Sequence, residues 1–157
     1  MENIYSTDWD LSQEQPGYVW DRIRLGRRTG ARMLGASVYL IKPGQKSFPY
    51  HYHHGNEEML IVLDGSVTVR TPDGDHVAGR GDALSFATGP AGAHQLINHT
   101  DRDARVLMMS TMVSPEIVEY PDSGKVGVFA ERAPGDPSSG IRAILDGGAV
   151  VDYFDGE

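Results

Sequence analysis

Residues 44–65 read GQKSFPYHYHHGNEEMLIVLDG, which combines a histidine-rich segment with an unbroken apolar run over 59–63. The segment holds three histidines and two glutamates within eight positions: His51, His53, His54, Glu57 and Glu58. Imidazole nitrogens and carboxylate oxygens gathered this closely are the donors that a first-row transition-metal ion binds. We therefore expect these residues to supply part of a metal site, and the rest of the chain to supply any missing ligand.

Two of the histidines share one face of a predicted strand. His51 and His53 are two residues apart, so in an extended chain their side chains point the same way, whereas His54 points the opposite way. Gly55-Asn56 is a turn signal, so this alternation does not extend to the glutamates. The segment 58–63 that follows is the strongest predicted strand of the chain.

The remaining segments alternate between short apolar runs and turn signals. Asp64-Gly65 predicts a two-residue hairpin turn into the next strand, and Arg27–Gly30 predicts another turn. Further strands are predicted at 18–23, 31–41, 66–70, 75–78, 83–86, 94–98 and 104–113. No segment shows a convincing amphipathic helical pattern. Short strands that recur at intervals of roughly ten residues are typical of an all-β sandwich or barrel.

Size and composition favour a single β-rich domain. The chain has 157 residues and a mass of 17.1 kDa, which is enough for one domain with its own core. Its 19 glycines and 9 prolines favour short strands and turns over long helices. There is no cysteine, so disulfides and thiolate ligands are excluded, and a metal ion must be bound by nitrogen and oxygen atoms.

The net charge limits the partners that the chain is expected to have. A formal charge of -8 repels phosphate, so we expect neither a nucleic-acid partner nor an anionic membrane. The first twenty residues are polar and acidic, without the apolar core of a secretory signal, and no run approaches membrane-spanning length. We therefore expect a soluble protein located in the cytoplasm.

We expect three regions along the chain. Residues 1–17 lack periodicity and end in a Pro-Gly pair, so they are predicted to form an N-terminal arm. Residues 18–115 are predicted to form the β-barrel domain. Residues 116–157 are predicted to form an extension that packs on the barrel, with Tyr153 and Phe154 holding its end in place.

The histidine segment resembles the first motif of the cupin superfamily of small β-barrels. In general form, that motif is Gly, five residues, His-x-His, three or four residues, Glu, six residues and Gly. Here six residues separate Gly44 from His51, and four separate His53 from Glu58. Six more residues lead to Gly65, whereas the preceding glutamate would leave seven, so the spacing selects Glu58.

A second stretch resembles the second cupin motif, which is Gly, five residues, Pro-x-Gly, two residues, His, three residues and Asn. Gly81-Asp82 opens it, and His94 closes it with Asn98 after three intervening residues. The middle departs from the motif, because Ala87 stands where the proline is expected and Pro90-x-Gly92 lies closer to the histidine. The two motifs together cover residues 44–98.

The resemblance implies both a fold and a metal site. The fold is an all-β, single-domain cupin barrel, which is a double-stranded β-helix of the jelly-roll type. The site is one divalent transition metal ion bound by His51, His53, Glu58 and His94. Three neutral imidazoles and one carboxylate suit Fe(II), Mn(II), Ni(II), Co(II) or Zn(II), and a six-coordinate ion would keep about two positions open for water or substrate. No general acid or base is identified.

Other polar and sulfur-containing residues are expected to have structural or surface roles. Those expected at the surface or at the edge of the site are His54, Glu57, His76 and His99. Asn98 is expected to stabilise the end of its strand. Tyr50 and Tyr52 flank the ligands and are expected to pack in the barrel, and Met108, Met109 and Met112 to fill its core.

Two functions are compatible with such a site. The first is a metal-dependent enzyme that acts on a small polar molecule, a sugar or a carboxylic acid, as a dioxygenase, decarboxylase or isomerase. The second is a non-catalytic protein that binds or senses a small molecule. The intact ligand set favours an enzyme, while the lack of an identified proton donor keeps binding open. A transcription regulator is disfavoured by the acidic charge and by the lack of room for a helix-turn-helix.

The expected protein partner is a second copy of the chain. The outer faces of the predicted strands 31–41 and 58–63 are apolar. Similar proteins commonly dimerise through such sheets, so the resemblance implies a homodimer.

Overall fold

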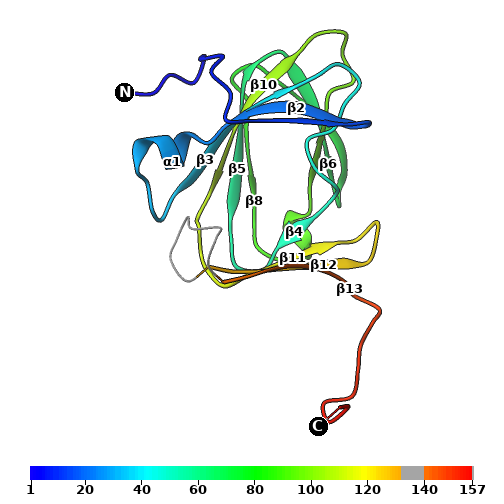
Figure 1. Cartoon of the computed structure of the whole chain (residues 1–157). Helices are drawn as coiled ribbons and strands as arrows, with labels where there is room; N and C mark the ends of the chain where they lie inside the picture. The colour runs from blue at the N-terminus through cyan, green and yellow to red at the C-terminus, as the bar shows by residue number, and fades with distance from the viewer. Residues whose placement is uncertain (132–139, 157) are drawn as a thin grey trace.

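The computed structural model describes residues 1–131 and 140–156 and confirms an all-β fold (Figure 1). Its strands are β1 (Leu11–Gln15), β2 (Tyr18–Ile23), β3 (Gly35–Ile41), β4 (Tyr52–His53), β5 (Glu58–Asp64), β6 (Ser66–Thr71), β7 (Gly74–Gly79), β8 (Ala83–Phe86), β9 (Gln95–Ile97), β10 (Ala104–Ser110), β11 (Glu116–Tyr120), β12 (Lys125–Glu131) and β13 (Gly140–Asp146). Two short helical segments lie within these ranges, α1 (Leu25–Thr29) and the 3-10 turn η1 (Pro90–Gly92). Neither of these described helices is long and apolar enough to cross a membrane.

Two layers of antiparallel strands enclose the interior. The first layer is one sheet with the strand order β1-β2-β3-β10-β5-β8. The second consists of the sheets β7-β6-β9 and β13-β12-β11-β4, which are joined by an isolated bridge between His51 and His94. Figure 1 shows β5 and β8 on one side of the barrel and β6 on the other. The predicted ligands His51 and His94 therefore meet where the two smaller sheets join.

The interior is filled by the inward faces of both layers. In β5, Leu60 and Val62 are 0% and 1% exposed, whereas Met59 points outward and is 37% exposed. On the other side, β6 contributes two equally buried valines, Val67 and Val69. This alternation confirms the predicted strand, and it places Glu58 on the same inward face as Leu60.

The predicted hairpin between β5 and β6 is wrong. β5 pairs with β10 and β8, whereas β6 pairs with β7 and β9, so Asp64-Gly65 forms a corner where the chain passes from one sheet to another. Gly65 has a φ of 74°, and a Cβ at this position would lie 2.9 Å from the Asp103 carbonyl oxygen. A hairpin turn and this corner both require a residue with a positive φ. The Asp64-Gly65 dipeptide alone therefore did not distinguish a hairpin from a passage between sheets.

The first forty residues differ from the prediction in the extent of their elements. The predicted turn at 27–30 is the end of α1, which Gly30 caps in the left-handed conformation. With five residues, α1 is too short to show a hydrophobic period. The predicted strand 31–41 begins only at Gly35, and residues 11–15 of the predicted arm form β1, which pairs with β2.

The sheet β11–β13 extends the second layer beyond β4. β11 pairs with β4 on one side and with β12 on the other. After β13 the chain leaves the barrel (Figure 1), and Tyr153 and Phe154 are 88% and 74% exposed. The prediction that these two aromatics hold the end of the chain on the barrel is therefore wrong. The domain boundaries proposed at residues 17 and 115 stay predictions.

Candidate metal centre

The fold brings the four predicted ligands together. His51 lies directly before β4, His53 ends it, Glu58 begins β5, and His94 lies directly before β9. Glu58 Oε2 is 3.3 Å from His53 Nε2 and 3.2 Å from His94 Nε2. The ring centroid of His51 is 5.1 Å from that of His53 and 4.7 Å from that of His94. Glu57, which the motif spacing excluded, is exposed.

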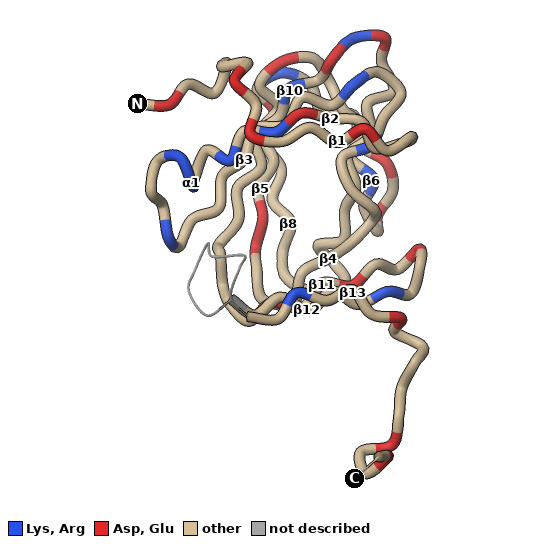
Figure 2. Tube along the Cα trace, in the orientation of Figure 1, with Lys and Arg blue, Asp and Glu red and all other residues tan. Residues whose placement is uncertain are grey.

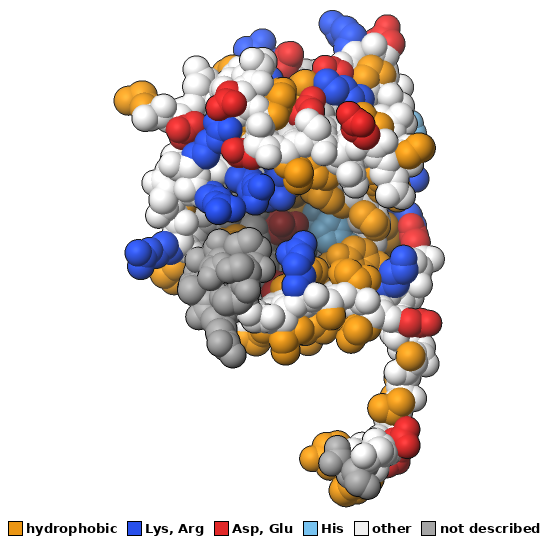
Figure 3. Space-filling model, in the orientation of Figure 1, with side chains coloured by type: hydrophobic (Ala, Val, Ile, Leu, Met, Phe, Trp, Pro, Cys, Tyr) orange, Lys and Arg blue, Asp and Glu red, His pale blue; other side chains and the backbone are white. Residues whose placement is uncertain are grey.

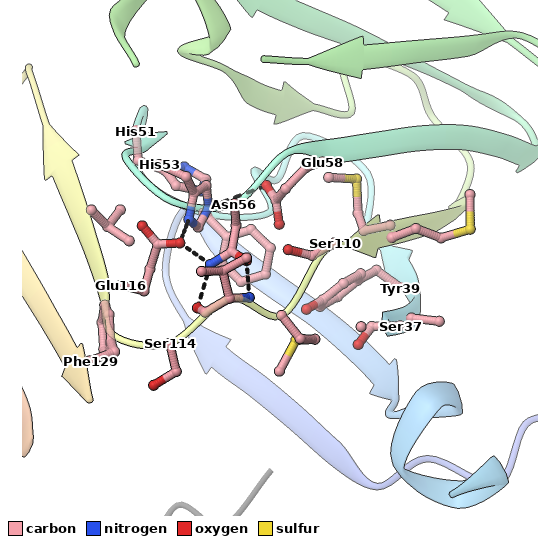
Figure 4. A pocket seen from close by; sticks show the side chains of 18 of the residues that line it. Ser37, Tyr39, His51, His53, Asn56, Glu58, Ser110, Ser114, Glu116 and Phe129 are labelled. Carbon is pink, nitrogen blue, oxygen red and sulfur yellow. Dashed lines mark hydrogen bonds and ion pairs between the residues drawn. The ribbon is translucent and has the colours of Figure 1, made fainter. Parts of the chain in front are cut away.

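Three of these residues form the tightest group. The potential ligand atoms of His51, His53 and Glu58 all lie within 4.8 Å of one another, which fits a single metal ion. Figure 4 shows these three side chains together at one end of the pocket. His94 is more deeply buried, at 3% exposed, and contacts this group through Glu58.

Backbone carbonyl groups orient two of the imidazole rings. His51 Nδ1 is 2.8 Å from the Pro49 carbonyl oxygen, and His94 Nδ1 is 3.0 Å from that of Gly92. A carbonyl oxygen only accepts hydrogen bonds, so Nδ1 carries a proton in both rings and Nε2 is the ring atom that remains to bind a metal ion. The ring of His94 also stacks on Phe86, with 3.8 Å between the centroids. Both rings are thus held in the tautomer in which Nε2 binds a metal ion.

The glycine-rich loop that departs from the cupin motif still positions His94. Its residues 90–92 form η1. A Cβ on Gly92 would lie 1.7 Å from the Ala87 carbonyl oxygen, so only glycine fits at this position. The carbonyl oxygen of Gly92 then accepts the hydrogen bond from His94 Nδ1.

Glu116, on β11, is a buried carboxylate that the sequence analysis missed. Its Oε1 accepts hydrogen bonds of 3.1 Å from the backbone N–H groups of His54 and Gly55, and its Oε2 accepts one from the Asn56 side chain. Oε2 also lies 3.8 Å from His53 Nδ1, which is buried and makes no hydrogen bond within the described residues. Glu116 therefore anchors the turn between β4 and β5 and places a negative charge beside His53.

Burial and neighbouring charges set the protonation of the group. Burial, with smaller contributions from His94 and His53, lowers the pKa of His51 to about 4. Burial also opposes a charge on His53, but Glu58 and Glu116 outweigh it and raise the pKa of His53 above its usual 6.5. Burial opposes the charge of Glu58, yet its hydrogen bond with His53 and the neighbouring ring of His94 hold the pKa of Glu58 well below its usual range. In neutral solution Glu58 is therefore ionised and His51 is neutral, the states in which both bind metal.

His51, His53 and Glu58 lie at the floor of a cavity of about 380 Å³, whereas His94 is buried beneath it. Figure 3 shows histidine and acidic side chains at the bottom of a hollow whose edge carries basic side chains. Apolar residues form much of the wall, among them Met108, Met109, Met112, Val113 and Phe129. Arg22 from β2 and Arg142 from β13 also line the cavity. Neither arginine stands near the two motifs in the sequence, so no local pattern assigns either of them to the site.

The residues expected to lie outside the ligand group do so. His54 turns outward, where its Nε2 is 2.7 Å from Glu119 Oε1, and His76 and His99 are exposed. Asn98 stabilises its strand end as predicted, because its Nδ2 donates to the carbonyl oxygens of Ile41 and Arg102 at 2.9 and 2.7 Å. The methionines differ in part from the prediction: Met108 is 9% exposed, but all three line the cavity rather than only filling the core.

Comparison with known proteins agrees with this geometry. The chain is similar in structure to a sugar phosphate isomerase of the cupin superfamily from Silicibacter pomeroyi, with a TM-score of 0.73, 26% identity, and coverage of 87% of this chain and 82% of that one. For a candidate sugar phosphate isomerase from Acidithiobacillus ferrooxidans the TM-score is 0.75, with 26% identity and the same 87% and 82% coverage. The polyketide cyclase RemF from Streptomyces resistomycificus shares the fold, with a TM-score of 0.57, 23% identity, and coverage of 70% of this chain and 78% of that one. No protein of curated function matches the sequence.

The sequence itself carries a family signal. Residues 37–110 match the profile of the family described as Cupin domain, and they include both motifs and all four predicted ligands. The same residues build the greater part of both layers and the clustered histidines and glutamate. On the sequence match, the barrel and the shared structures, residues 37–110 of this chain are a cupin domain.

Proposed function

We propose that this chain is a metal-dependent enzyme that acts on a small polar molecule, a sugar or a carboxylic acid. One divalent transition metal ion would be bound by His51, His53, Glu58 and His94. The observation that carries the proposal is the convergence of His51, His53 and Glu58 at the floor of a cavity of about 380 Å³, with the buried His94 in contact with Glu58. This volume lies in the range of small-molecule sites.

The donor set supports a mononuclear centre. Two rings expose Nε2 because their Nδ1 atoms donate to carbonyl groups, and Glu58 is ionised. Nitrogen and oxygen donors of this kind suit Fe, Mn, Ni, Co or Zn, among which the residues do not discriminate. When bound, such an ion polarises a carbonyl or hydroxyl oxygen of the substrate and lowers the pKa of a coordinated water.

The cavity wall would orient the substrate over this centre. Its apolar part excludes water, which strengthens the electrostatic interactions at the floor. Tyr39 lines the cavity and is 4% exposed. Burial raises the pKa of Tyr39 to about 12, so its hydroxyl stays protonated in neutral solution and serves as a hydrogen-bond donor rather than as a base.

Among the reaction types, isomerisation has the most support. The two similar structures at 26% identity, each matched over 87% of this chain, are a sugar phosphate isomerase and a candidate for the same activity. The polyketide cyclase, at 23% identity, supports only the fold. We therefore rank isomerisation of a sugar derivative ahead of dioxygenation and decarboxylation.

Elemental analysis of protein purified without added metal tests the centre. We expect about one ion per chain in the wild type and a large loss in His53→Ala and Glu58→Ala. Glu57→Ala is the matched control, because this neighbouring glutamate is exposed, and it should retain the metal. Negligible metal in all of these proteins would refute the centre.

Incubation with sugars, sugar phosphates and carboxylic acids tests the reaction. NMR spectra would detect an isomerised product, oxygen uptake would reveal a dioxygenase, and release of carbon dioxide would reveal a decarboxylase. Each activity must disappear in Glu58→Ala. Turnover that persists in this variant would show that the reaction does not use the centre.

The second candidate function is binding of a small molecule without turnover. It is favoured by the state of Glu116, the other carboxylate at this end of the cavity. Its oxygens already accept three hydrogen bonds, so it is not a free general base. A ligand that binds to the metal-loaded protein and is recovered unchanged would support this function over the first.

We also propose that the chain forms a homodimer through the outer faces around β3 and β5. Met33, Leu34 and Met59 are 85%, 53% and 37% exposed there, and a second copy would cover them. Size-exclusion chromatography with light scattering measures the mass directly. A monomeric mass at micromolar concentration would refute the dimer.

A further inference from the structure

We propose that Arg22 and Arg142 form an anion subsite in the cavity, and that the substrate carries a carboxylate or phosphate group that binds there. This inference rests on the proposed function, because it concerns the same cavity. The proposed function leaves the charge of the substrate open, because the predicted metal ligands do not specify it. The anion subsite assigns a negative charge to the substrate.

Arg22 is held in place, but its charge is not neutralised. Its Nε and Nη2 both donate to Ser37 Oγ, at 3.0 and 2.9 Å, and its guanidinium carbon lies 5.2 Å from the ring centroid of Tyr39. A hydroxyl and an aromatic face orient a guanidinium without cancelling its charge. Among the side chains of residues 1–130 and 140–156, no carboxylate forms an ion pair with Arg22. Figure 4 shows Ser37 and Tyr39 at the end of the pocket away from His51 and Glu116.

Arg142 reaches the same cavity from β13. It is exposed, and its guanidinium carbon lies 4.9 Å from the ring centroid of Phe129, which also lines the cavity. Among the side chains of residues 1–130 and 140–156, no carboxylate forms an ion pair with Arg142 either. By contrast, Arg70 lies outside the cavity and pairs with Asp122 at 2.6 Å. The charges of the two cavity arginines are therefore available to a ligand.

The charge around Arg22 is opposite in sign to that of the chain. The chain has a formal charge of -8, yet residues 22–32 hold five of its fourteen lysines and arginines and no acidic residue. Of these five, only Arg28 has ion-pair partners in the described part of the chain. Figure 2 shows basic positions on α1 and again on the sheet of β11–β13. Such a local positive potential attracts anions and raises their rate of binding.

The rest of the cavity fits an anion that is attached to a larger body. Arg22 and Arg142 line the cavity but are not among the predicted metal ligands, so a charged group of a substrate that binds to them leaves the open positions of a metal ion to other oxygen atoms of the same substrate. The wall of the same cavity contains Met108, Met109 and Met112, whose thioether side chains adapt to a non-polar part of a ligand. A substrate bound in this way would direct its uncharged oxygen atoms at the ligand group.

Calorimetric titration with matched probes tests the subsite. Phenyl phosphate and phenylacetate carry the two anionic groups on an aromatic body, whereas phenylacetamide is uncharged. The metal-loaded full chain is compared with Arg22→Gln and Arg142→Gln, and with Arg102→Gln as the control, because Arg102 is exposed and does not line the cavity. We expect an anion to bind the wild type at least about tenfold more tightly than the amide, and each cavity substitution to weaken it about tenfold.

The control should bind the anion as the wild type does, and the preferred probe identifies the group as a phosphate or a carboxylate. Unchanged affinity in both cavity variants, equal binding of phenylacetamide, or no binding of either anion would refute the subsite. If Arg22→Gln does not fold, the exposed Arg142→Gln decides the question. Metal content is measured on the same samples. Arginine-dependent anion binding by a protein without metal would refute the proposed function and leave the subsite standing.

Discussion

Replacing Glu116 by glutamine tests whether one buried carboxylate holds the turn before β5. The substitution preserves the shape of the side chain, and the amide oxygen still accepts from the backbone N–H groups of His54 and Gly55. The new amide NH₂ group, however, faces the Asn56 side chain, which also donates. In the variant, the NH₂ groups of the new amide and of Asn56 would face each other, whereas in the wild type the Asn56 NH₂ group donates to a charged carboxylate oxygen. Glu116→Gln should therefore destabilise the fold.

The expected magnitude follows from the loss of this one hydrogen bond. A hydrogen bond to a charged group contributes about 1.5–3 kcal/mol. Asn56 does not compensate by turning over, because its Oδ1 already accepts from the backbone N–H of Val113. We therefore expect the free energy of unfolding to fall by about 2 kcal/mol. In a domain of this size that change lowers Tm by about 4–8 °C.

Thermal unfolding of the metal-free protein, followed by circular dichroism, measures this change. Glu119→Gln is the matched control, because Glu119 lies on the same strand but is partly exposed and bonds the His54 side chain at 2.7 Å. Exposed pairs of this kind contribute about 0.2–1 kcal/mol. In Glu116→Gln the metal affinity should also fall about tenfold, because the charge beside His53 is lost. A decrease in Tm no larger than that of the control would contradict the role of Glu116.

Three further predictions concern the ligand loop, pH and the core. Gly92→Ala should abolish metal binding while most of the fold survives, because a Cβ 1.7 Å from the Ala87 carbonyl oxygen displaces the loop that orients His94. Elemental analysis measures the metal content and circular dichroism the fold. A metal content at the wild-type level would contradict this prediction. Since the pKa of His53 is raised above 6.5, this ring holds a proton that a metal ion must displace, so metal affinity should rise with pH in the range above 6.5; a flat profile in calorimetry would refute the assignment. Leu60→Ala, at a fully buried position, should lower the free energy of unfolding by about 2–5 kcal/mol in chemical denaturation, and a loss below about 1 kcal/mol would contradict its place in the core.

The closeness of the predicted ligands could be expected from the sequence because local spacing encodes it. His51 and His53 alternate correctly along one short strand, and Glu58 starts the next one on its inward face. Each of these relations spans only a few residues, so strand periodicity and the motif spacing were sufficient. His94 was found only through the second motif, because the bridge that joins it to His51 connects positions 43 residues apart.

The errors arise where a local signal admits two geometries. Asp64-Gly65 was read as a hairpin, but the same positive φ turns the chain into another sheet. Tyr153 and Phe154 were expected on the barrel because aromatic residues usually become buried, yet they remain exposed. Glu116 was missed for a different reason. The backbone groups that it binds are 61 and 62 residues away, and no pattern within one strand reports such a contact.

The two kinds of residue in the cavity come from different parts of the chain. All four predicted metal ligands lie within residues 37–110, which match the Cupin domain family, whereas Arg22, Glu116, Phe129 and Arg142 lie outside that range. Flanking strands β2, β11, β12 and β13 bring these outer residues to the same cavity. The shared barrel therefore accounts for the candidate metal centre, while the flanking strands supply the charge and part of the apolar wall that a substrate would contact. Since the barrel supports many chemistries, substrate choice in this protein should change with substitutions in the flanking strands, and metal binding with substitutions in the barrel.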